Sequence, residues 1–241
     1  MNKITSALTA FILPIFLACG GGSESDDQGA KEPSNTKDNA PSTCNAPSGS
    51  ACYDITFTGL WTQSSHPVDF PPNPHFSPLI GATHNSSITL WASGELASKG
   101  IQSMAETGNT SPLKTEIEGY IAKGSAQVIV QGKRIDATES TKVSIVMSPS
   151  FPLMSVTSMI APSPDWFVGV NSLSLLDANN DWIEEKTVLL DRVYDAGTDD
   201  GTTFTSADAP ATPHKPIERL VDKPFGLDSP PIAKLDIKQV K

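Results

Sequence analysis

Short segments in which apolar and polar side chains alternate are the feature that most constrains the fold of this chain. Residues 53–58 read YDITFT, and comparable apolar segments lie at residues 88–91, 127–130, 143–147, 153–160, 166–170, 173–176 and 188–190. A two-residue period is typical of a strand with one buried face. Clusters of Pro, Ser, Asn and Asp separate the segments and favour turns. The pattern predicts an all-β fold, either a sandwich or a barrel.

Two short helices are expected in the connections between strands. Apolar residues recur at helical spacing in residues 96–105 and again in residues 113–121. Ser111 and Pro112 suit the cap and the first turn of the second helix, and Gly124 suits its end. The C-terminal residues are Pro-rich as far as residues 235–237, which we interpret as an edge strand or a loosely held tail.

The N-terminus has the layout of a secretory signal. Residues 1–18 carry one Lys near the start and then an apolar run that is too short to cross a bilayer. Cys19 follows Phe-Leu-Ala, which resembles the processing site of bacterial lipoproteins, where the Cys becomes lipidated. A plain signal peptide cut nearby is the alternative. Gly20 after the Cys favours an outer-membrane lipoprotein or a cell-surface location in a bacterial envelope.

The next segment is a predicted tether. Residues 20–43 contain no Val, Ile, Leu, Met, Phe, Trp or Tyr, so they cannot bury enough apolar area to offset the entropy of ordering. Such a flexible chain has a reach on the order of 25 Å. We therefore predict a lipoprotein signal peptide at 1–18, a lipidated Cys and disordered tether at 19–43, a folded domain at 44–221, and a Pro-rich tail with a possible edge strand at 222–241.

Charge and cysteine content narrow the function further. The chain has 17 Lys and Arg against 27 Asp and Glu, a net charge of −10, so nucleic acid is not an expected partner. Of the three Cys residues, Cys44 and Cys52 remain if Cys19 is lipidated. Because disulfides persist in exported proteins, we expect these two to be bridged. Two free or separately paired thiols are the alternative.

Several unusual strings then follow one another in a recognisable order. They are GLW at 59–61, HPVDFP at 66–71, HFSPLIGATHN at 75–85, ASKG at 97–100, AETG at 105–108, APSPDWFVGV at 161–170 and DAGTDDG at 195–201. In this order they resemble the spondin N-terminal domain, the extracellular module of F-spondin and mindin. The resemblance extends over about residues 52–217.

The resemblance implies both a fold and a site. It implies an antiparallel β-sandwich, similar to calcium-dependent membrane-docking domains, with one bound calcium held by Asp165, Asp195 and Asp199. It also implies a non-enzymatic adhesion or recognition role, with a cell-surface or matrix protein or glycan as partner. Animal members have a Cys where this chain has Leu176, so the family's disulfide cannot form and Cys52 is left for Cys44. Animal members also tend to have Asp in place of Asn171.

The acidic residues support a cation site on chemical grounds as well. Calcium binds about six to eight oxygen ligands, usually including several carboxylates. Asp195 and Asp199 lie four residues apart around the small residues Ala196 and Gly197, and Asp165 directly precedes an apolar strand. Three converging carboxylates would repel one another without a cation. The alternative for each Asp is a structural role in a turn.

Rival sites are weaker. The string at 177–181 matches the start of an EF-hand loop, but Trp182 and Val188 stand where Gly and Glu are required, so we interpret it as a hairpin turn. His66, His75 and His84 lie nine residues apart, which makes zinc conceivable, but structural roles are favoured.

Enzymatic motifs are poor, since there is no Gly-x-Ser-x-Gly string. Two alternatives to a calcium-dependent adhesion module stay open. One is a glycan-binding module on the same scaffold, which requires exposed aromatic side chains. The other is a hydrolase that uses the metal and paired carboxylates on envelope glycans.

Overall fold

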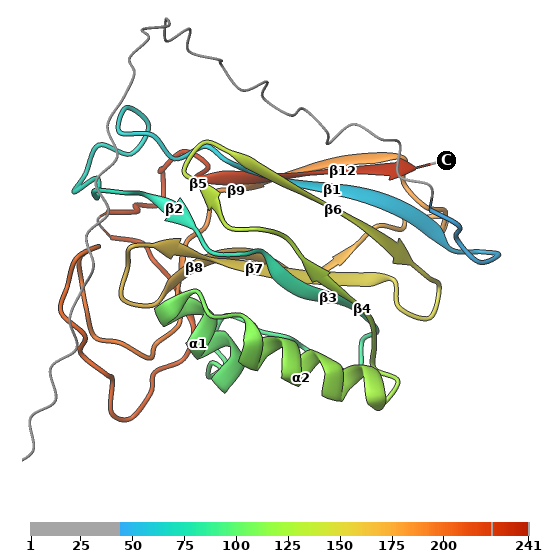
Figure 1. Ribbon diagram of the computed structural model, residues 1–241, viewed down its shortest axis with the longest axis horizontal. Coiled ribbons are helices and arrows are strands. Elements are labelled where there is room, and N and C mark those ends of the chain that lie inside the picture. The colour runs from blue at the N-terminus through green and yellow to red at the C-terminus, as the bar shows by residue number, and fades with distance from the viewer. Residues whose placement is uncertain (1–43, 223, 241) are drawn as a thin grey trace, which may run out of the picture. The chain divides into compact units, whose positions relative to one another are not determined.

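The computed structural model describes residues 44–222 and 224–240, and these form an antiparallel β-sandwich with two helices (Figure 1). The predicted fold class is therefore confirmed. The predicted signal peptide at 1–18, Cys19 and the tether through residue 43 lie outside the described residues. Among the described residues, none of the helices has the length and the hydropathy needed to cross a membrane.

The first layer of the sandwich is a four-stranded antiparallel sheet. Its strand order is β6 (Ser140–Met147), β1 (Ala51–Gly59), β12 (Ala233–Val240) and β9 (Glu185–Leu190). The alternating residues of β1 behave as the sequence predicts, because Tyr53, Ile55 and Phe57 are all fully buried. Each such burial stabilises the fold by about 1.5–3 kcal/mol.

The second layer is the larger sheet. Its first four strands, in order, are β11 (Glu218–Arg219), β10 (Tyr194–Asp195), β8 (Trp166–Ser174) and β7 (Leu153–Ala161). Beyond β7 the sheet branches, because both β2 (His75–Phe76) and β3 (Ile80–His84) pair with β7. The outer strands are β5 (Ile135–Asp136), which pairs with β2, and β4 (Ala126–Gln131), which pairs with β3. The main hydrophobic core lies between the two sheets.

The helices form a third layer on the outer face of the second sheet (Figure 1). They are α1 (Lys99–Thr107) and α2 (Ser111–Ala122), close to the predicted positions. The buried side chains of Ile101 and Leu113 pack with Phe167 of β8 in a second hydrophobic core. The predicted cap of α2 is wrong: Ser111 is the first residue of the helix, and Thr110 precedes it without a side-chain cap hydrogen bond.

Two predicted strands differ from the structure. Residues 88–91 form no strand; instead, Leu90 and Trp91 are buried loop residues, and Trp91 packs edge-on against Phe167. The side chains of Leu90 and Trp91 anchor this loop in the second hydrophobic core, although the segment has no strand pairing. The strand predicted at 166–170 and the start of the one predicted at 173–176 are one continuous strand, β8, which ends at Ser174. β8 shifts register against β7 between Met154 and Val156.

The C-terminal strand is an interior strand. The segment that the sequence leaves open as an edge strand or a loose tail is β12, which pairs with β1 on one side and β9 on the other. Its residues Leu235 and Ile237 are fully buried in the main core. The last strand of the chain is therefore part of the folded domain.

The two ends of the sandwich have different characters. At one end, Cys44 is joined to Cys52 by a disulfide, with Cα atoms 6.0 Å apart. Strands β7 and β8 run to the opposite end, where Asp165 lies in the turn that joins them. The segment that enters the described domain and the predicted acidic site therefore lie at opposite ends (Figure 1).

Candidate functional site

Asp165 is the centre of the acidic end. It directly precedes β8, and its side chain is fully buried. One carboxylate oxygen, Oδ2, accepts hydrogen bonds from the backbone N–H of Thr198 at 2.7 Å, from the backbone N–H of Asp199 at 3.0 Å and from the Thr198 hydroxyl at 3.2 Å. Asp165 thereby joins the turn between β7 and β8 to the DAGTD loop, which we define as residues 195–199.

The other oxygen of Asp165 has no partner. Oδ1 is buried and accepts no hydrogen bond from the described residues. Burial is the main cause, and the negative charge of Asp195 the second, of a raised Asp165 pKa, which is about 6 although the three hydrogen bonds to Oδ2 act in the opposite direction. A buried carboxylate oxygen without a proton donor is costly. A cation bound at Oδ1 would offset that cost.

Asp195 is the neighbouring carboxylate. It belongs to β10, where it pairs with Trp166 of β8, and its Oδ1 accepts a hydrogen bond from the backbone N–H of Gly197 at 2.8 Å. Burial raises the pKa of Asp195, whereas the Gly197 N–H, the nearby Trp166 indole and the Lys215 ammonium lower it. The indole nitrogen of Trp166 does not meet hydrogen-bond geometry, so we regard its influence as a dipole effect.

Gly197 is required by the backbone of the DAGTD loop. Its φ angle is +73°, which favours glycine. A Cβ atom at this position would also overlap the carbonyl oxygen of Lys215. The loop can therefore lie against residues 215–216 only with glycine at this position.

Asp199 has a different environment. Its Oδ1 accepts from the backbone N–H of Gly201 at 2.7 Å, and its Oδ2 accepts from the backbone N–H of Ala209 at 2.8 Å. Both oxygens therefore hold the loop of residues 200–209, which is the turn role that the sequence left open. Each oxygen still retains a second lone pair that can serve a ligand.

The structure brings the three predicted aspartates to one end of the sandwich without assembling them. Within residues 44–222 and 224–240, no group of three His, Cys, Asp or Glu side chains is arranged as a metal site. Asp165 and Asp195 are electrostatic neighbours, while Asp199 faces its own loop. The donors present fit a hard cation, because they are carboxylate oxygens and one of them accepts no hydrogen bond from residues 44–222 and 224–240.

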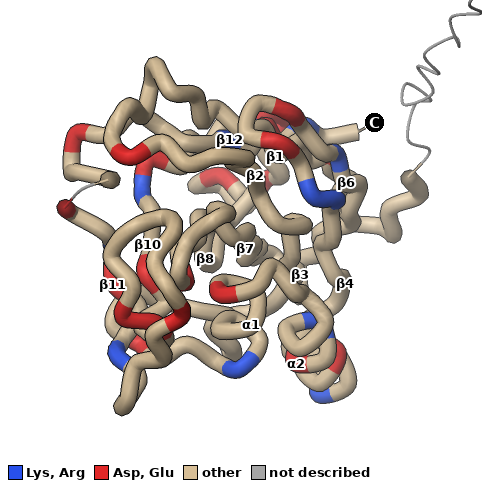
Figure 2. The backbone as a smooth tube through the Cα atoms, turned by 60° about the vertical axis from the view of Figure 1, so that its left-hand side comes forward, with Lys and Arg blue, Asp and Glu red and all other residues tan. Residues whose placement is uncertain are grey.

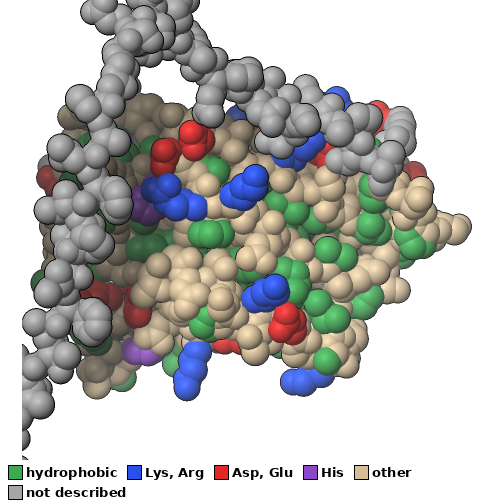
Figure 3. Space-filling model, viewed as in Figure 1, with side chains coloured by type: hydrophobic (Ala, Val, Ile, Leu, Met, Phe, Trp, Pro, Cys, Tyr) green, Lys and Arg blue, Asp and Glu red, His purple; other side chains and the backbone are tan. Residues whose placement is uncertain are grey.

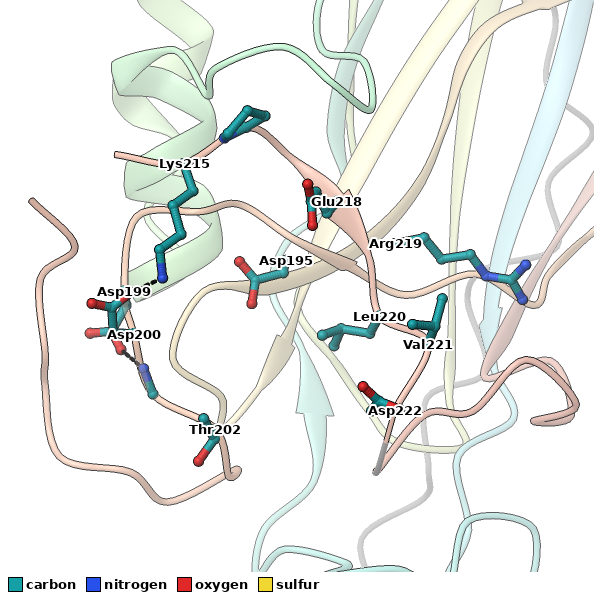
Figure 4. A pocket seen from close by; sticks show the side chains of 12 residues that line it. Asp195, Asp199, Asp200, Thr202, Lys215, Glu218, Arg219, Leu220, Val221 and Asp222 are labelled. Atoms are coloured by element: carbon teal, nitrogen blue, oxygen red, sulfur yellow. Dashed lines mark hydrogen bonds and ion pairs between the residues drawn. The ribbon is translucent and has the colours of Figure 1, made fainter. Parts of the chain in front are cut away.

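Sequence reasoning missed several charged residues beside this cluster. A pocket of about 330 Å³ is lined by Asp195 and Asp199 together with Asp200, Lys215, Glu218, Arg219 and Asp222 (Figure 4). Lys215 donates to Asp200 at 2.6 Å. Acidic positions gather around β10 and β11 (Figure 2), whereas acidic, basic and apolar side chains are interspersed on the face in Figure 3. Only the run of acids in residues 195–200 signalled this pocket in the sequence.

The three histidines at nine-residue spacing, 66, 75 and 84, have separate partners. His66 Nε2 lies 3.1 Å from the Pro230 carbonyl oxygen, and His75 Nδ1 lies 2.8 Å from the Asn73 carbonyl oxygen. The buried His84 contacts the Ser155 hydroxyl through Nε2 at 2.8 Å. These contacts fit the structural roles that the sequence favours.

The comparisons with known proteins decide the family. The Spondin_N family model matches residues 51–230. The chain belongs to the spondin N-terminal domain family. This spondin domain is 36% identical to spondin-2 of Rattus norvegicus over 176 residues, which cover 70% of this chain and 52% of that relative. It is 35% identical to spondin-1 of Gallus gallus over 181 residues, which cover 71% of this chain and 22% of that relative.

The similarity is confined to one part of each relative. The spondin domain spans about half the length of spondin-2 and about a fifth of spondin-1. It includes Asp165, Asp195 and Asp199, which all lie within the matched residues 51–230. The family domain therefore continues after β9 as far as residue 230, and it includes the DAGTD loop.

Proposed function

We propose that this domain is a calcium-binding, non-enzymatic adhesion or recognition module, held in a bacterial cell envelope by a lipid on Cys19. Family membership supports the adhesion role, in which the partner is a cell-surface or matrix protein or glycan. The layout of residues 1–19 supports the lipid anchor and the outer-membrane or surface location.

The unpartnered Oδ1 of Asp165 carries the calcium part of the proposal. Asp165 and Asp195 are the inner ligands in this account, and Asp199 supplies a ligand through a lone pair that its loop leaves available. When bound, the ion would neutralise the acidic end and order the loops around it. Extracellular calcium modules typically have dissociation constants of about 10⁻⁴–10⁻³ M.

The calcium proposal is tested by thermal unfolding and calorimetry of the full chain. At about 10 mM calcium, a site of this affinity stabilises the native state by about 2 kcal/mol. For a domain of this size, that corresponds to a rise in Tm of about 4–8 °C over the value in EGTA. Magnesium at the same concentration is the control for nonspecific salt effects. Identical Tm values in calcium and EGTA, without heat of calcium binding, would contradict the proposal.

The lipid anchor needs its own test. Metabolic labelling with an alkyne-bearing palmitate should label the full chain in bacterial cells, and Cys19→Ser should remove the label. The matched control is Cys44→Ser, which leaves Cys19 intact. Equal labelling of the Cys19→Ser chain and the unsubstituted chain would contradict the proposed anchor.

A further inference from the structure

A second pocket lies at the acidic end of the sandwich, and Asp165, Asp195 and Asp199 are not among the residues that line it. It has a volume of about 460 Å³ and lies between residues 63–72 and the loop tip at residues 203–205. Both segments lie at the left-hand end of the view in Figure 1. Pockets of about 300–1,000 Å³ are the usual size for small ligands.

The floor of this pocket is aromatic and rigid. Phe204 is 4% exposed, and its ring centroid lies 5.4 Å from that of Trp61 and 5.2 Å from that of Trp166. The half-buried Phe70 packs edge-on against Trp61, with centroids 5.8 Å apart. Because Trp61 and Trp166 are fixed in the main core, the two phenylalanine rings are held in place for a ligand.

The loop that carries Phe204 is held at both ends. Asp199 binds the N–H groups of Gly201 and Ala209 at the base of the loop. Near the tip, the Ser206 hydroxyl accepts from the backbone N–H of Thr203 at 3.0 Å. The aromatic floor is therefore preorganised before any ligand binds.

The rim of the pocket is polar and available. Gln63 and Asp69 are exposed, and in the described part of the chain no hydrogen bond or ion pair engages either side chain. Asp69 has a φ angle of +50°, a backbone conformation that costs free energy in a residue other than glycine. Thr205 adds a hydroxyl group to the same rim.

We propose that this pocket binds a sugar ring of a neutral glycan. A pyranose presents an apolar C–H face, which packs on aromatic and proline side chains, and hydroxyl groups, which a carboxylate and an amide can bind. The half-buried Phe70 and the exposed Pro67 and Pro72 provide most of the first kind of surface, to which Phe204, at 4% exposed, adds a small area. Asp69 and Gln63 provide the second kind. The inference names a class of partner for the recognition role, and it does not depend on calcium binding.

The charge of the pocket restricts the glycan further. Asp69 is the charged residue of this lining set, which contains no Lys, Arg or His. A sulfated, phosphorylated or uronic-acid glycan would therefore meet a carboxylate without a compensating cation. A Lys-bearing peptide is the rival ligand, because a carboxylate beside aromatic rings also attracts cations. The larger number of uncharged polar groups on the rim favours the neutral sugar.

Isothermal titration of the full chain tests the proposal with defined probes. The probes are maltohexaose, cellohexaose, mannohexaose and galactohexaose, with heparin and a Lys-rich peptide for comparison. The variants Gln63→Ala and Asp69→Asn alter exposed groups, and Asn tolerates the positive φ of residue 69, so both variants should leave the Tm unchanged. The matched controls Gln131→Ala and Asp181→Asn alter exposed residues of the same types elsewhere on the domain.

The expected result is binding of at least one neutral oligosaccharide in EGTA, with about tenfold weaker affinity in each pocket variant and unchanged affinity in both controls. Heparin should not compete. The proposal is overturned if none of the four oligosaccharides binds, if both pocket variants bind as the unsubstituted chain does, or if heparin or the peptide is the ligand that the pocket variants lose. Because the titration is done in EGTA, failure of the calcium proposal leaves this test unaffected.

Discussion

Two five-residue loops of this domain share three residues, yet the pKa of the first aspartate shifts in opposite directions in the two loops. The DAGTD loop at 195–199 and the DANND loop at 177–181 both place two Asp residues four positions apart. In both, Oδ1 of the first Asp accepts the N–H of the residue two positions later, at 2.8 Å. Yet the pKa of Asp195 is raised, and that of Asp177 is lowered.

Burial explains the difference. Asp177 lies on the surface, where two backbone N–H groups stabilise its charge and lower its pKa. Asp195 is partly buried beside the fully buried Asp165, and desolvation outweighs its hydrogen bond. A local acidic string therefore defines a turn, and only its packing against another carboxylate makes it a candidate cation site.

The largest effect is expected from Gly197→Ala. The new Cβ would overlap the Lys215 carbonyl oxygen at a residue with positive φ, so we expect a loss of about 3–5 kcal/mol of stability. The matched change in the exposed loop is Asn180→Ala, where φ is +63° and the loop is free to relax. It should cost about 1 kcal/mol. Urea unfolding measures both, and equal losses would contradict the difference in packing.

Asp165→Asn should stabilise the calcium-free domain. Asparagine keeps an oxygen for the Thr198 and Asp199 N–H groups but removes a buried charge. The raised pKa of about 6 means that the charged form of Asp165 costs the folded domain about 2–3 kcal/mol of stability at pH 7. The same variant should lose the calcium-dependent rise in Tm.

In contrast, Asp177→Asn should slightly destabilise the domain in EGTA, because the lowered pKa of Asp177 shows that its charge is stabilised. Thermal unfolding in EGTA measures the Tm of both variants. If both have a higher Tm than the unsubstituted chain, or both a lower one, the difference between the two loops is contradicted.

Titration of the Asp165 carboxylate makes the stability of the calcium-free domain depend on pH. The folded pKa of Asp165 is about 6, above the ordinary value of 3.8, so the native state holds its proton more tightly than the unfolded state does. Its contribution is fully present below pH 3.8 and is lost as the pH rises through 6. The buried His66 and His84, whose pKa values are lowered by burial, act in the opposite direction below pH 6.5.

Comparison with Asp165→Asn isolates the aspartate from the histidines. Between pH 5 and pH 6, the unsubstituted chain should lose about 1 kcal/mol relative to this variant. Urea unfolding at both pH values in EGTA measures the difference. A constant difference from pH 4 to pH 7 would mean that Asp165 titrates normally.

The smallest effect is expected from Lys215→Gln. The Lys215 ammonium favours the charged form of Asp195 and lowers its pKa, and it would also repel a cation bound beside it. Removing it should increase calcium affinity about twofold to threefold, since the side chain is exposed and screened by water and salt. Calorimetric titration measures this change. Lys186→Gln, in the exposed part of β9, is the control, and a weaker calcium affinity of Lys215→Gln would contradict the geometry.

The sequence predicted the fold where local pattern determines structure. The alternation of Tyr53, Ile55 and Phe57 identified β1, and helical spacing identified α1 and α2. It failed at Leu90 and Trp91, because a short apolar run can equally anchor a loop. It also left β12 undecided, because pairing with β1 and β9 depends on strands far away in the chain.

The site was predictable in its residues but not in its geometry. The string around Asp165 and the DAGTD loop identified the acidic end. The sequence could not show that each oxygen of Asp199 accepts a hydrogen bond from the loop at 200–209. It also could not show that one oxygen of Asp165 accepts none from the described part of the chain. It also missed the pocket at Phe70 and Phe204, because these residues lie far apart in the chain and come together by packing on Trp61.

The pKa of Asp165, measured by NMR titration of its carboxyl carbon with and without calcium, tests the central claim most directly. We expect a value of about 6 in EGTA. In saturating calcium, the value should fall well below the ordinary 3.8, because the bound cation favours the charged form. An ordinary pKa in EGTA, or a raised pKa that calcium leaves unchanged, would contradict the account.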